Sequence, residues 1–421
     1  SPSTASVFWS SGTGCSVRVF VLGGDGFCGW PIALHLSARG DDVTIVDNLS
    51  RRRVDRELAV GSLTPITPLN ERLTAWREVS GHEIRHANID LAQDYDGFVD
   101  LLRAERPDAV VHLAEQRSVP YSMGSTPRRR YTFENNLNAT HNVLVALVDS
   151  GVDAHLVHMG STGIYGYESI GYQLPEGYVE AEFQSKKTEI LHPANPLSIY
   201  HLTKAQDQLA LAFFSKHEGL RTTDLVQGAV WGTQTDQTAR DKRLINRFDY
   251  DDVYGTVLNR FIVQAALGHP LTVYGRGEQT RAFIHISDVV RCVTIALDNP
   301  AVRGERMRVF NQIAESRRVI DLARLVANVW PGVTISNLDN PRQEPAANDL
   351  DLSNESLRAL GLTPKLIADG VLAEIRDIAA PYAHRANRTK IDPPSPAQSA
   401  GGHQGNEVLS VLASIKKKIG P

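Results

Sequence analysis

Apolar runs alternate with segments of helical periodicity over residues 17–230 of the 421-residue chain. The runs are rich in β-branched residues and predict buried strands at 17–23, 43–46, 109–113 and 155–159. Helical patterns accompany these runs at 31–39, 98–104 and 142–148. Strands that alternate with helices pair in parallel and carry helices on both faces. The pattern therefore predicts an α/β fold built on a Rossmann-type, doubly wound parallel sheet.

The pattern becomes looser after residue 232. Residues 236–252 are dense in charge and poor in apolar side chains, which predicts a long loop that carries substrate contacts. Amphipathic helices are predicted at 258–266, 289–296 and 319–329. We therefore expect a disordered leader at 1–16, a Rossmann domain at 17–234, a smaller C-terminal α/β substrate lobe at 235–383 with chain crossings between the two, and a flexible tail at 384–421.

Composition narrows the classes of function. The chain has 44 basic and 48 acidic side chains, well mixed, and a net charge of −4, whereas nucleic-acid-binding proteins usually carry a basic excess. No stretch approaches the roughly 18 apolar residues that span a bilayer. The three cysteines, Cys15, Cys28 and Cys292, lack the spacing of a disulfide framework or a zinc site. We therefore expect a cytoplasmic protein that binds no nucleic acid, membrane or metal.

A glycine-rich turn follows the first predicted strand. Gly23, Gly26 and Gly29 are spaced as G-x-x-G-x-x-G and lead into the first predicted helix. Glycines here allow a tight turn and let a pyrophosphate approach the backbone at a helix N-terminus. We therefore predict that this turn, with Phe27 and Cys28 inside it, binds a dinucleotide cofactor.

Acidic residues end the next two strands and favour one form of that cofactor. A carboxylate at Asp47, after 43–46, would accept hydrogen bonds from the adenosine ribose hydroxyls and repel a 2′-phosphate. This favours NAD, although Arg51 and Arg52 nearby would suit NADP. Asn48 is a further candidate contact, and Asp90 either contacts the adenine or caps the end of its strand.

Tyr200 and Lys204 are four residues apart, so they share one face of a helix. A cationic lysine beside a phenol favours the phenolate and lowers the pKa of the tyrosine. A phenolate can take the proton of a sugar hydroxyl while a hydride leaves. Ser161, at the end of the 155–159 strand, can hydrogen-bond the same sugar oxygen. These residues predict an oxidoreductase centre.

The combination resembles the extended short-chain dehydrogenase/reductase family of nucleotide-sugar epimerases and dehydratases. The likeness runs from about residue 18 to residue 380. Beyond the glycine turn and the Tyr-x-x-x-Lys pair, it rests on the segments 46–49, 62–66, 115–123, 246–251, 268–275 and 340–342. The resemblance implies a nucleotide-sugar substrate, NAD as cofactor and a homodimer paired through two long helices.

Within this family, the likeness is to a branch that joins sulfite to carbon 6 of UDP-glucose. The resemblance implies that NAD⁺ takes hydride from C4, and that the resulting ketone acidifies the C5 proton. Loss of the 6-hydroxyl gives a 5,6-ene, sulfite adds at C6, and hydride returns to C4. Tyr200 would be the base, and Lys204 would also fix the nicotinamide ribose. His201 would accept and donate protons near C5 and C6. Alternatively, it is a helix residue that is packed in a polar pocket.

The resemblance also assigns substrate contacts. Arg117 would meet sulfite or a phosphate, or it forms a structural ion pair. The segment 275–288 resembles the part of the family that holds the nucleotide diphosphate, where Arg281 would bind phosphate oxygens, with Arg342 as a second candidate. Either arginine could instead form an ordinary surface ion pair. The predicted substrate-binding residues are Gln116, Arg117, Gln227, Asn259, Arg281 and Arg342.

One strand end departs from this branch. The branch usually has Gly-Thr-Met-Gly where this chain has Gly160-Ser161-Thr162-Gly163, and histidine where it has Gln227. Serine with small neutral neighbours also resembles the 4-epimerases, so C4 epimerisation of an unusual sugar is the alternative reaction. Thr162 is a catalytic candidate in both reactions. The acidic pair of the 4,6-dehydratases is absent. A non-catalytic NAD-binding regulator would not need Tyr200 and Lys204.

Overall fold

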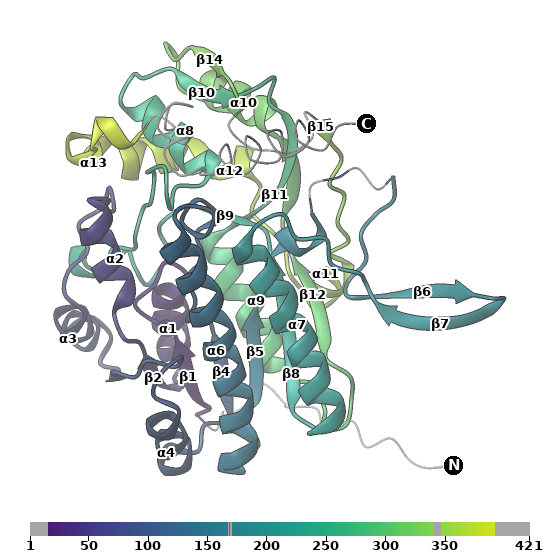
Figure 1. Cartoon of the computed structure of the whole chain (residues 1–421). Coiled ribbons are helices and arrows are strands. Elements are labelled where there is room, and N and C mark those ends of the chain that lie inside the picture. Colours follow the sequence, from purple (N-terminus) through teal and green to yellow (C-terminus); the bar gives the residue numbers. More distant parts are fainter. Residues whose placement is uncertain (1–15, 167, 169–170, 341–346, 392–421) are drawn as a thin grey trace, which may run out of the picture.

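The computed structural model describes residues 16–166, 168, 171–340 and 347–391. Its main feature is a seven-stranded sheet in the order β12-β8-β5-β4-β1-β2-β3, in which every pairing is parallel (Figure 1). The strands are β1 Arg18–Leu22, β2 Asp42–Val46, β3 Ile84–Ala87, β4 Ala109–His112, β5 His155–Met159, β8 Arg221–Gln227 and β12 Arg308–Gln312. The predicted doubly wound Rossmann sheet is confirmed.

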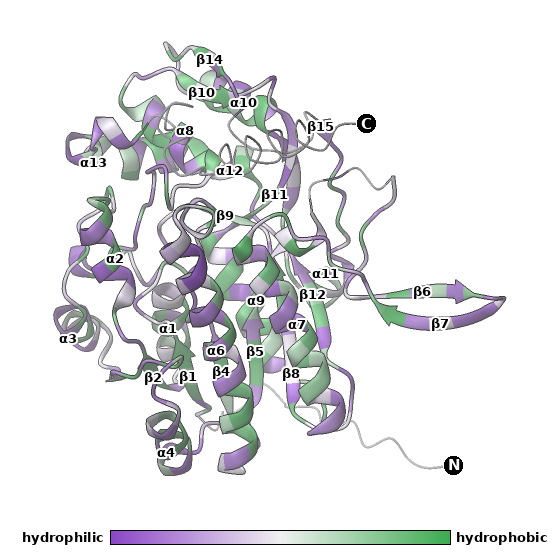
Figure 2. Cartoon of the chain, in the orientation of Figure 1, coloured by the Kyte–Doolittle hydropathy of each residue, from purple (hydrophilic) through white to green (hydrophobic). Residues whose placement is uncertain are grey.

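Helices cover both faces of this sheet because its strands are apolar on both sides. Val19 and Val21 of β1 pack in one core with α1, α3 and α9, whereas Phe20 and Leu22 pack in another with α4, α6 and α7. Figure 2 shows hydrophobic and hydrophilic residues interspersed along α6 and α7, as expected for helices with one buried face. The helices are α1 Gly29–Ala38, α3 Leu69–Ser80, α4 Tyr95–Glu105, α6 Thr126–Ser150, α7 Ile199–His217 and α9 Ile286–Asp298.

A smaller lobe lies above the carboxyl ends of the main strands in Figure 1. Strand β9 Ala229–Trp231 joins the two parts, since it follows β8 and pairs with β11 of the lobe. The chain then returns to the main sheet through α9 and β12. The lobe contains α8 Val257–Ala266, β10 Leu271–Tyr274, β11 Glu278–His285, β13 Glu315–Arg318, α10 Val319–Val329, β14 Ile335–Leu338, β15 Ala347–Asn348, α12 Ile367–Ala373, the π-helix η3 Glu374–Ala379 and α13 Ala380–Tyr382.

Shorter elements complete the described part of the chain. An antiparallel hairpin of β6 and β7 projects from the body at the right of Figure 1. Among the helices of the described residues, none has the length and apolar character needed to cross a bilayer. The remaining elements are α2 Ser50–Leu58, α5 Val119–Ser122, η1 Thr162–Tyr165, β6 Tyr178–Phe183, β7 Lys186–Leu191, η2 Lys242–Leu244, α11 Glu355–Ala359, η4 Ala383–Arg385 and η5 Arg388–Lys390.

Candidate active site

Two adjoining cavities lie at the carboxyl ends of the central strands, where doubly wound sheets bind their ligands. The first, the cofactor cavity, is lined by the glycine turn and the ends of β2 and β3. The second, the substrate cavity, is lined by residues 160–163 and parts of β9 and β11. Five side chains line both cavities and therefore mark where cofactor and substrate would meet: Phe27, Cys28, Arg117, Tyr200 and Gln227.

The glycine turn has the close packing that a dinucleotide site requires. Gly23 has φ +83°, a conformation that favours glycine. A β-carbon at Gly29 would lie 2.2 Å from the carbonyl oxygen of Gly23. The turn therefore holds the N-terminus of α1 against the end of β1, and only glycine fits at both positions. Gly26, Phe27 and Cys28 line the cavity between them.

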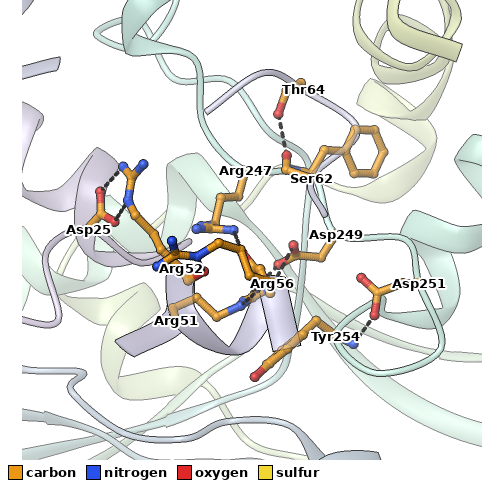
Figure 3. Close-up of polar contacts among 12 residues, drawn as sticks. Asp25, Arg51, Arg52, Arg56, Ser62, Thr64, Arg247, Asp249, Asp251 and Tyr254 are labelled. Carbon is orange, nitrogen blue, oxygen red and sulfur yellow. Dashed lines mark hydrogen bonds and ion pairs between the residues drawn. The ribbon is translucent and has the colours of Figure 1, made fainter. Parts of the chain in front are cut away.

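Asp47 lies at the end of β2 and lines the cofactor cavity. Its carboxylate accepts hydrogen bonds from the backbone amides of Asp25 (2.9 Å) and Leu49 (2.7 Å), which fix its orientation. Arg52 is paired with Asp25 through contacts of 2.5 and 2.8 Å. Arg51 is paired with Asp55 and Asp249, so both arginines already have carboxylate partners (Figure 3).

Asp90 and Asn48 line the same cavity and contact each other. The Asn48 amide donates to one carboxylate oxygen of Asp90 at 2.8 Å, and the Ala92 backbone amide donates to the other at 3.1 Å. Asp90 therefore caps the turn after β3 and also faces the cavity. Both interpretations of this residue are compatible with its position.

Helix α7 positions Tyr200 and Lys204. Its N-cap is Ser198, whose hydroxyl accepts a hydrogen bond from the His201 amide at 3.1 Å, so the helix begins just before Tyr200. Both side chains face the cofactor cavity. Burial raises the pKa of Tyr200 and the Glu115 carboxylate adds to this effect, whereas Lys204, Arg117 and Ser161 lower the pKa without outweighing burial. The expected fall in this pKa is therefore wrong for the protein by itself.

His201 and Thr162 face the substrate cavity beside Ser161. The Ser161 hydroxyl accepts a hydrogen bond from the Gly163 amide at 3.2 Å, which begins the short helix η1. The His201 ring lies against Gly163, and its centroid is 5.2 Å from that of Tyr200. One cavity thus presents two hydroxyl groups, an imidazole and a phenol.

Arg117 is both an ion-pair partner and a cavity residue. Its guanidinium lies 2.5 Å from the Asp249 carboxylate and 5.7 Å from the centre of the Phe27 ring. Asp249 belongs to residues 246–251, which are buried although they carry charge. Figure 3 shows how this segment meets α2, with Asp249 directed toward Arg51.

Comparison with known proteins identifies the family. Residues 19–311 match the model of the NAD dependent epimerase/dehydratase family. The chain belongs to this family. It is 43% identical over 380 residues to the chloroplastic UDP-sulfoquinovose synthase of Spinacia oleracea, which covers 89% of this chain and 78% of that protein. It is 39% identical over 380 residues to the UDP-sulfoquinovose synthase of Sulfolobus acidocaldarius, with 89% and 95% covered.

Solved structures agree with this assignment at the level of the fold. The UDP-glucose 4-epimerase of Thermotoga maritima has a TM-score of 0.63 at 21% identity, with 85% of this chain and 97% of that chain covered. The UDP-glucose 4-epimerase of Thermus thermophilus in complex with NAD has a TM-score of 0.60 at 25% identity, with 88% and 100% covered. These likenesses support the fold, and the resemblance to nucleotide-sugar enzymes is confirmed by the family match and the two relatives above.

The predicted substrate contacts differ in where the structure places them. Gln227 lines both cavities, and Arg281 lines the substrate cavity. Gln116 is instead on the cofactor side, where its amide donates to the Ser118 carbonyl and the Thr132 hydroxyl. Asn259 is buried within α8 and is absent from the lining of either cavity. Arg342 lies outside the described residues.

The partners of the predicted residues were not predicted from the sequence. Glu115, part of a recognised segment but given no role, lies 2.9 Å from the Lys204 ammonium. Asp249 holds Arg117, and Asp25 of the glycine turn holds Arg52. A signal was present, since three acidic residues occur inside family-like segments. Their partners are distant in sequence, however, and only the fold brings them together.

Proposed function

We propose that this protein converts UDP-glucose and sulfite into UDP-sulfoquinovose. The observation that carries this proposal is the identity of 39–43% over 380 residues to two UDP-sulfoquinovose synthases. The relatives come from a plant and an archaeon, so the likeness extends across distant organisms. The polar groups of the substrate cavity suit a reaction that moves protons at C4, C5 and C6.

NAD is the cofactor of this proposal. The glycine turn and Asp47 suit an unphosphorylated adenosine ribose, and the carboxylate partners of Arg51 and Arg52 make a 2′-phosphate site less favourable. NAD, when bound in the cofactor cavity, accepts a hydride from the sugar and later returns it. Lys204 would hold the nicotinamide ribose, and Asn48 and Asp90 would lie at the adenosine end.

Tyr200 begins the chemistry by accepting the proton of the C4 hydroxyl as the C4 hydride leaves. Ser161 hydrogen-bonds the C4 oxygen, and the new ketone acidifies the C5 proton. His201 takes that proton, and the 6-hydroxyl leaves with a proton as water, with Thr162 beside it. The sulfur lone pair of sulfite then forms a bond to C6, and a proton returns to C5. Tyr200 finally gives its proton to the C4 oxygen as a hydride returns to C4.

Arg117 is our candidate for the sulfite contact. It lines both cavities and its side chain is 35% exposed, so a small anion could reach it. Its ion-pair partner Asp249 is shared with Arg51, which also pairs with Asp55. Arg281 in the substrate cavity, together with Arg342, would bind the nucleotide diphosphate.

We also propose a homodimer paired through α6 and α7. Exposed apolar side chains on these helices support this: Leu209 is 61% exposed and Phe213 is 53% exposed, with Phe133 on α6 at 36%. Sedimentation equilibrium should give twice the chain mass, and Leu209→Glu should give the single-chain mass.

C4 epimerisation is the second candidate function. Ser161 and Thr162 favour it, because they replace the threonine and methionine expected of the sulfite-using branch. The test is incubation with UDP-glucose with and without sulfite, followed by mass analysis of the nucleotide sugars. A sulfonated product that requires sulfite supports the synthase, and a UDP-hexose of unchanged mass but inverted C4 supports the epimerase. Tyr200→Phe should remove either product.

A further inference from the structure

A fully buried charged cluster lies directly behind Lys204. It is formed by side chains from β4 and the loop after it, from β5, from α7 and from β8. These side chains are 0–4% exposed, so solvent screens their charges only weakly. The members of the Lys204 cluster are Lys204, Glu115, His158, Asp207, Asp224 and His112.

The Lys204 ammonium lies at the centre of this cluster. Its nitrogen is 2.9 Å from Glu115 Oε2, 3.3 Å from His158 Nε2 and 3.9 Å from Asp207 Oδ2. Ligand atoms of these three partners lie within 4.8 Å of one another. The ammonium therefore occupies the space that such a group could otherwise offer to a metal ion. Glu115 is held in turn by the Thr140 hydroxyl, which donates to its other oxygen at 2.9 Å.

The groups of the cluster shift one another's pKa values. Burial lowers the pKa of His112 to about 3, so this ring is neutral. Asp207, Asp224 and Glu115 raise the pKa of His158 to about 10 against the effects of burial and of Lys204. Three carboxyl groups thus face the Lys204 ammonium and an imidazole whose protonation they favour. Burial and the neighbouring Glu115 carboxylate raise the pKa of Asp207 to about 7, so Asp207 can take up or release a proton near neutral pH.

We propose that Glu115 is a positioning residue that fixes the Lys204 ammonium behind Tyr200 and limits how strongly the positive charge of Lys204 acts on the phenol. Asp207 serves as the counter-ion of Lys204 when the Glu115 charge is removed. The inference rests on the proposed function only in taking Tyr200 as the base for C4. Glu115 itself acts through Lys204.

The physical need for such a residue follows from burial. A buried ammonium without a counter-ion loses its proton readily, and a neutral Lys204 could not favour the phenolate. If Lys204 instead stayed charged with no carboxylate beside it, its full charge would act on the phenol. Tyr200 would then stay ionised when its proton must return to the sugar. A general acid–base group works best when its pKa lies near the working pH. Glu115 moderates the lysine between these limits.

The groups that face Tyr200 come from several elements. Lys204 and His201 are on α7 itself, Ser161 follows β5, and Glu115 and Arg117 follow β4. Lys204, Arg117 and Ser161 lower the pKa of the phenol, whereas Glu115 raises it. Removal of the Glu115 charge should therefore lower this pKa as long as Lys204 stays protonated.

The test is the pH dependence of the first hydride transfer, measured as reduction of bound NAD in a single turnover with UDP-glucose. This step is common to a synthase and a 4-epimerase, so it is informative even if no sulfonated product forms. In Glu115→Gln, Asp207 can ionise and keep Lys204 charged. The acid limb, meaning the low-pH side of the plot of rate against pH, should therefore move down by roughly one pH unit. Glu115→Asp should restore most of the wild-type profile.

A double variant and a matched control complete the test. Glu115→Gln with Asp207→Asn leaves Lys204 without its near carboxylates, so the acid limb should move up and the rate should fall at least tenfold. Glu374→Gln removes an equally buried carboxyl group in the other lobe and should leave the profile unchanged. NMR of ¹³C-labelled tyrosine, with Tyr200→Phe to assign the signal, should show the same direction of change in the protein without added sugar.

The proposal is overturned if Glu115→Gln is folded and slower but has an unmoved acid limb and tyrosine titration. That result would mean that Glu115 serves only for stability. An upward shift in the single variant would also overturn it, because Asp207 would then have failed to keep Lys204 charged.

Discussion

The His201 imidazole occupies the space that any side chain at position 163 would fill. A β-carbon placed on Gly163 would lie 2.1 Å from His201 Nε2, far inside contact distance. Glycine at this position therefore allows the ring to pack at the edge of the substrate cavity. The relationship explains how a chain without the acidic pair of the 4,6-dehydratases can still present an acid–base group there.

Gly163→Ala should therefore displace His201 and impair the steps at C5 and C6. Reduction of bound NAD by UDP-glucose should persist, because Tyr200 and Lys204 are unchanged. Formation of final product should fall roughly 10²-fold, the effect of a misplacement of about 1 Å. Gly61→Ala is the control, since a β-carbon there meets nothing within 4 Å. Equal losses in both steps would argue against a separate role for His201.

Tyr200→Phe should abolish turnover while it leaves nucleotide-sugar binding nearly intact. The ring still fills its place between the cavities, but the group that accepts the proton is gone. General-base catalysis typically contributes roughly 10²- to 10⁴-fold, so the rate should fall by at least that much. Tyr172→Phe, 54% exposed in the wild type, should have no effect. A variant that keeps a tenth of the rate would exclude Tyr200 as the base.

Asp47→Ala should weaken NAD binding, as measured by calorimetry. Loss of hydrogen bonds to a charged group costs about 1.5–3 kcal/mol, which corresponds to roughly 10- to 100-fold in affinity. The wild type should bind NADP more weakly than NAD. Asp100→Ala, an exposed carboxylate on α4, serves as the control. Equal or tighter NADP binding by the wild type would contradict the role given to Asp47.

Asp249→Asn should destabilise the protein, because it removes the buried carboxylate that Arg51 and Arg117 share. The neighbouring Arg51 and Arg117 guanidiniums hold the pKa of this buried carboxyl group below its usual range, against the effect of burial. Removal of one partner from a buried pair costs about 3–5 kcal/mol. Urea unfolding near neutral pH should show this loss.

The pH dependence of that loss has a definite sign. The ionised Asp249 stabilises the fold above the unfolded-state pKa of about 3.9, and its contribution disappears as pH falls through the lower folded-state pKa. The difference between wild type and Asp249→Asn should therefore shrink below about pH 4. Glu134→Gln, which breaks an exposed pair with Arg130, should cost less than about 1 kcal/mol at any pH.

The fold could be predicted because its strands and helices carry their periodicity locally. The 43–46 and 155–159 runs are strands β2 and β5 within one residue, and 319–329 is α10. The glycine turn and the Tyr200–Lys204 pair could be predicted for the same reason, since their spacing is short.

The ion pairs behind the site could not be predicted in this way. Charge density at 236–252 indicated a loop with substrate contacts, yet Asp249 is buried because Arg51 and Arg117, far away in sequence, neutralise it. Gln116, which is predicted to bind substrate, lines the cofactor cavity, and its amide donates to the Ser118 carbonyl and the Thr132 hydroxyl of α6. A side chain's partner depends on tertiary contacts, which the spacing of residues does not reveal.

The sulfonation of C6 is tested most directly by the reaction of UDP-glucose and sulfite in deuterium oxide. The product should be a UDP-sugar that carries a sulfonate on C6 and deuterium on C5, because the C5 proton is removed and a solvent-derived one returns. Mass spectrometry and NMR of the isolated nucleotide sugar would show both. An epimerised hexose without C5 deuterium, formed at the same rate without sulfite, would contradict the account and establish C4 epimerisation instead.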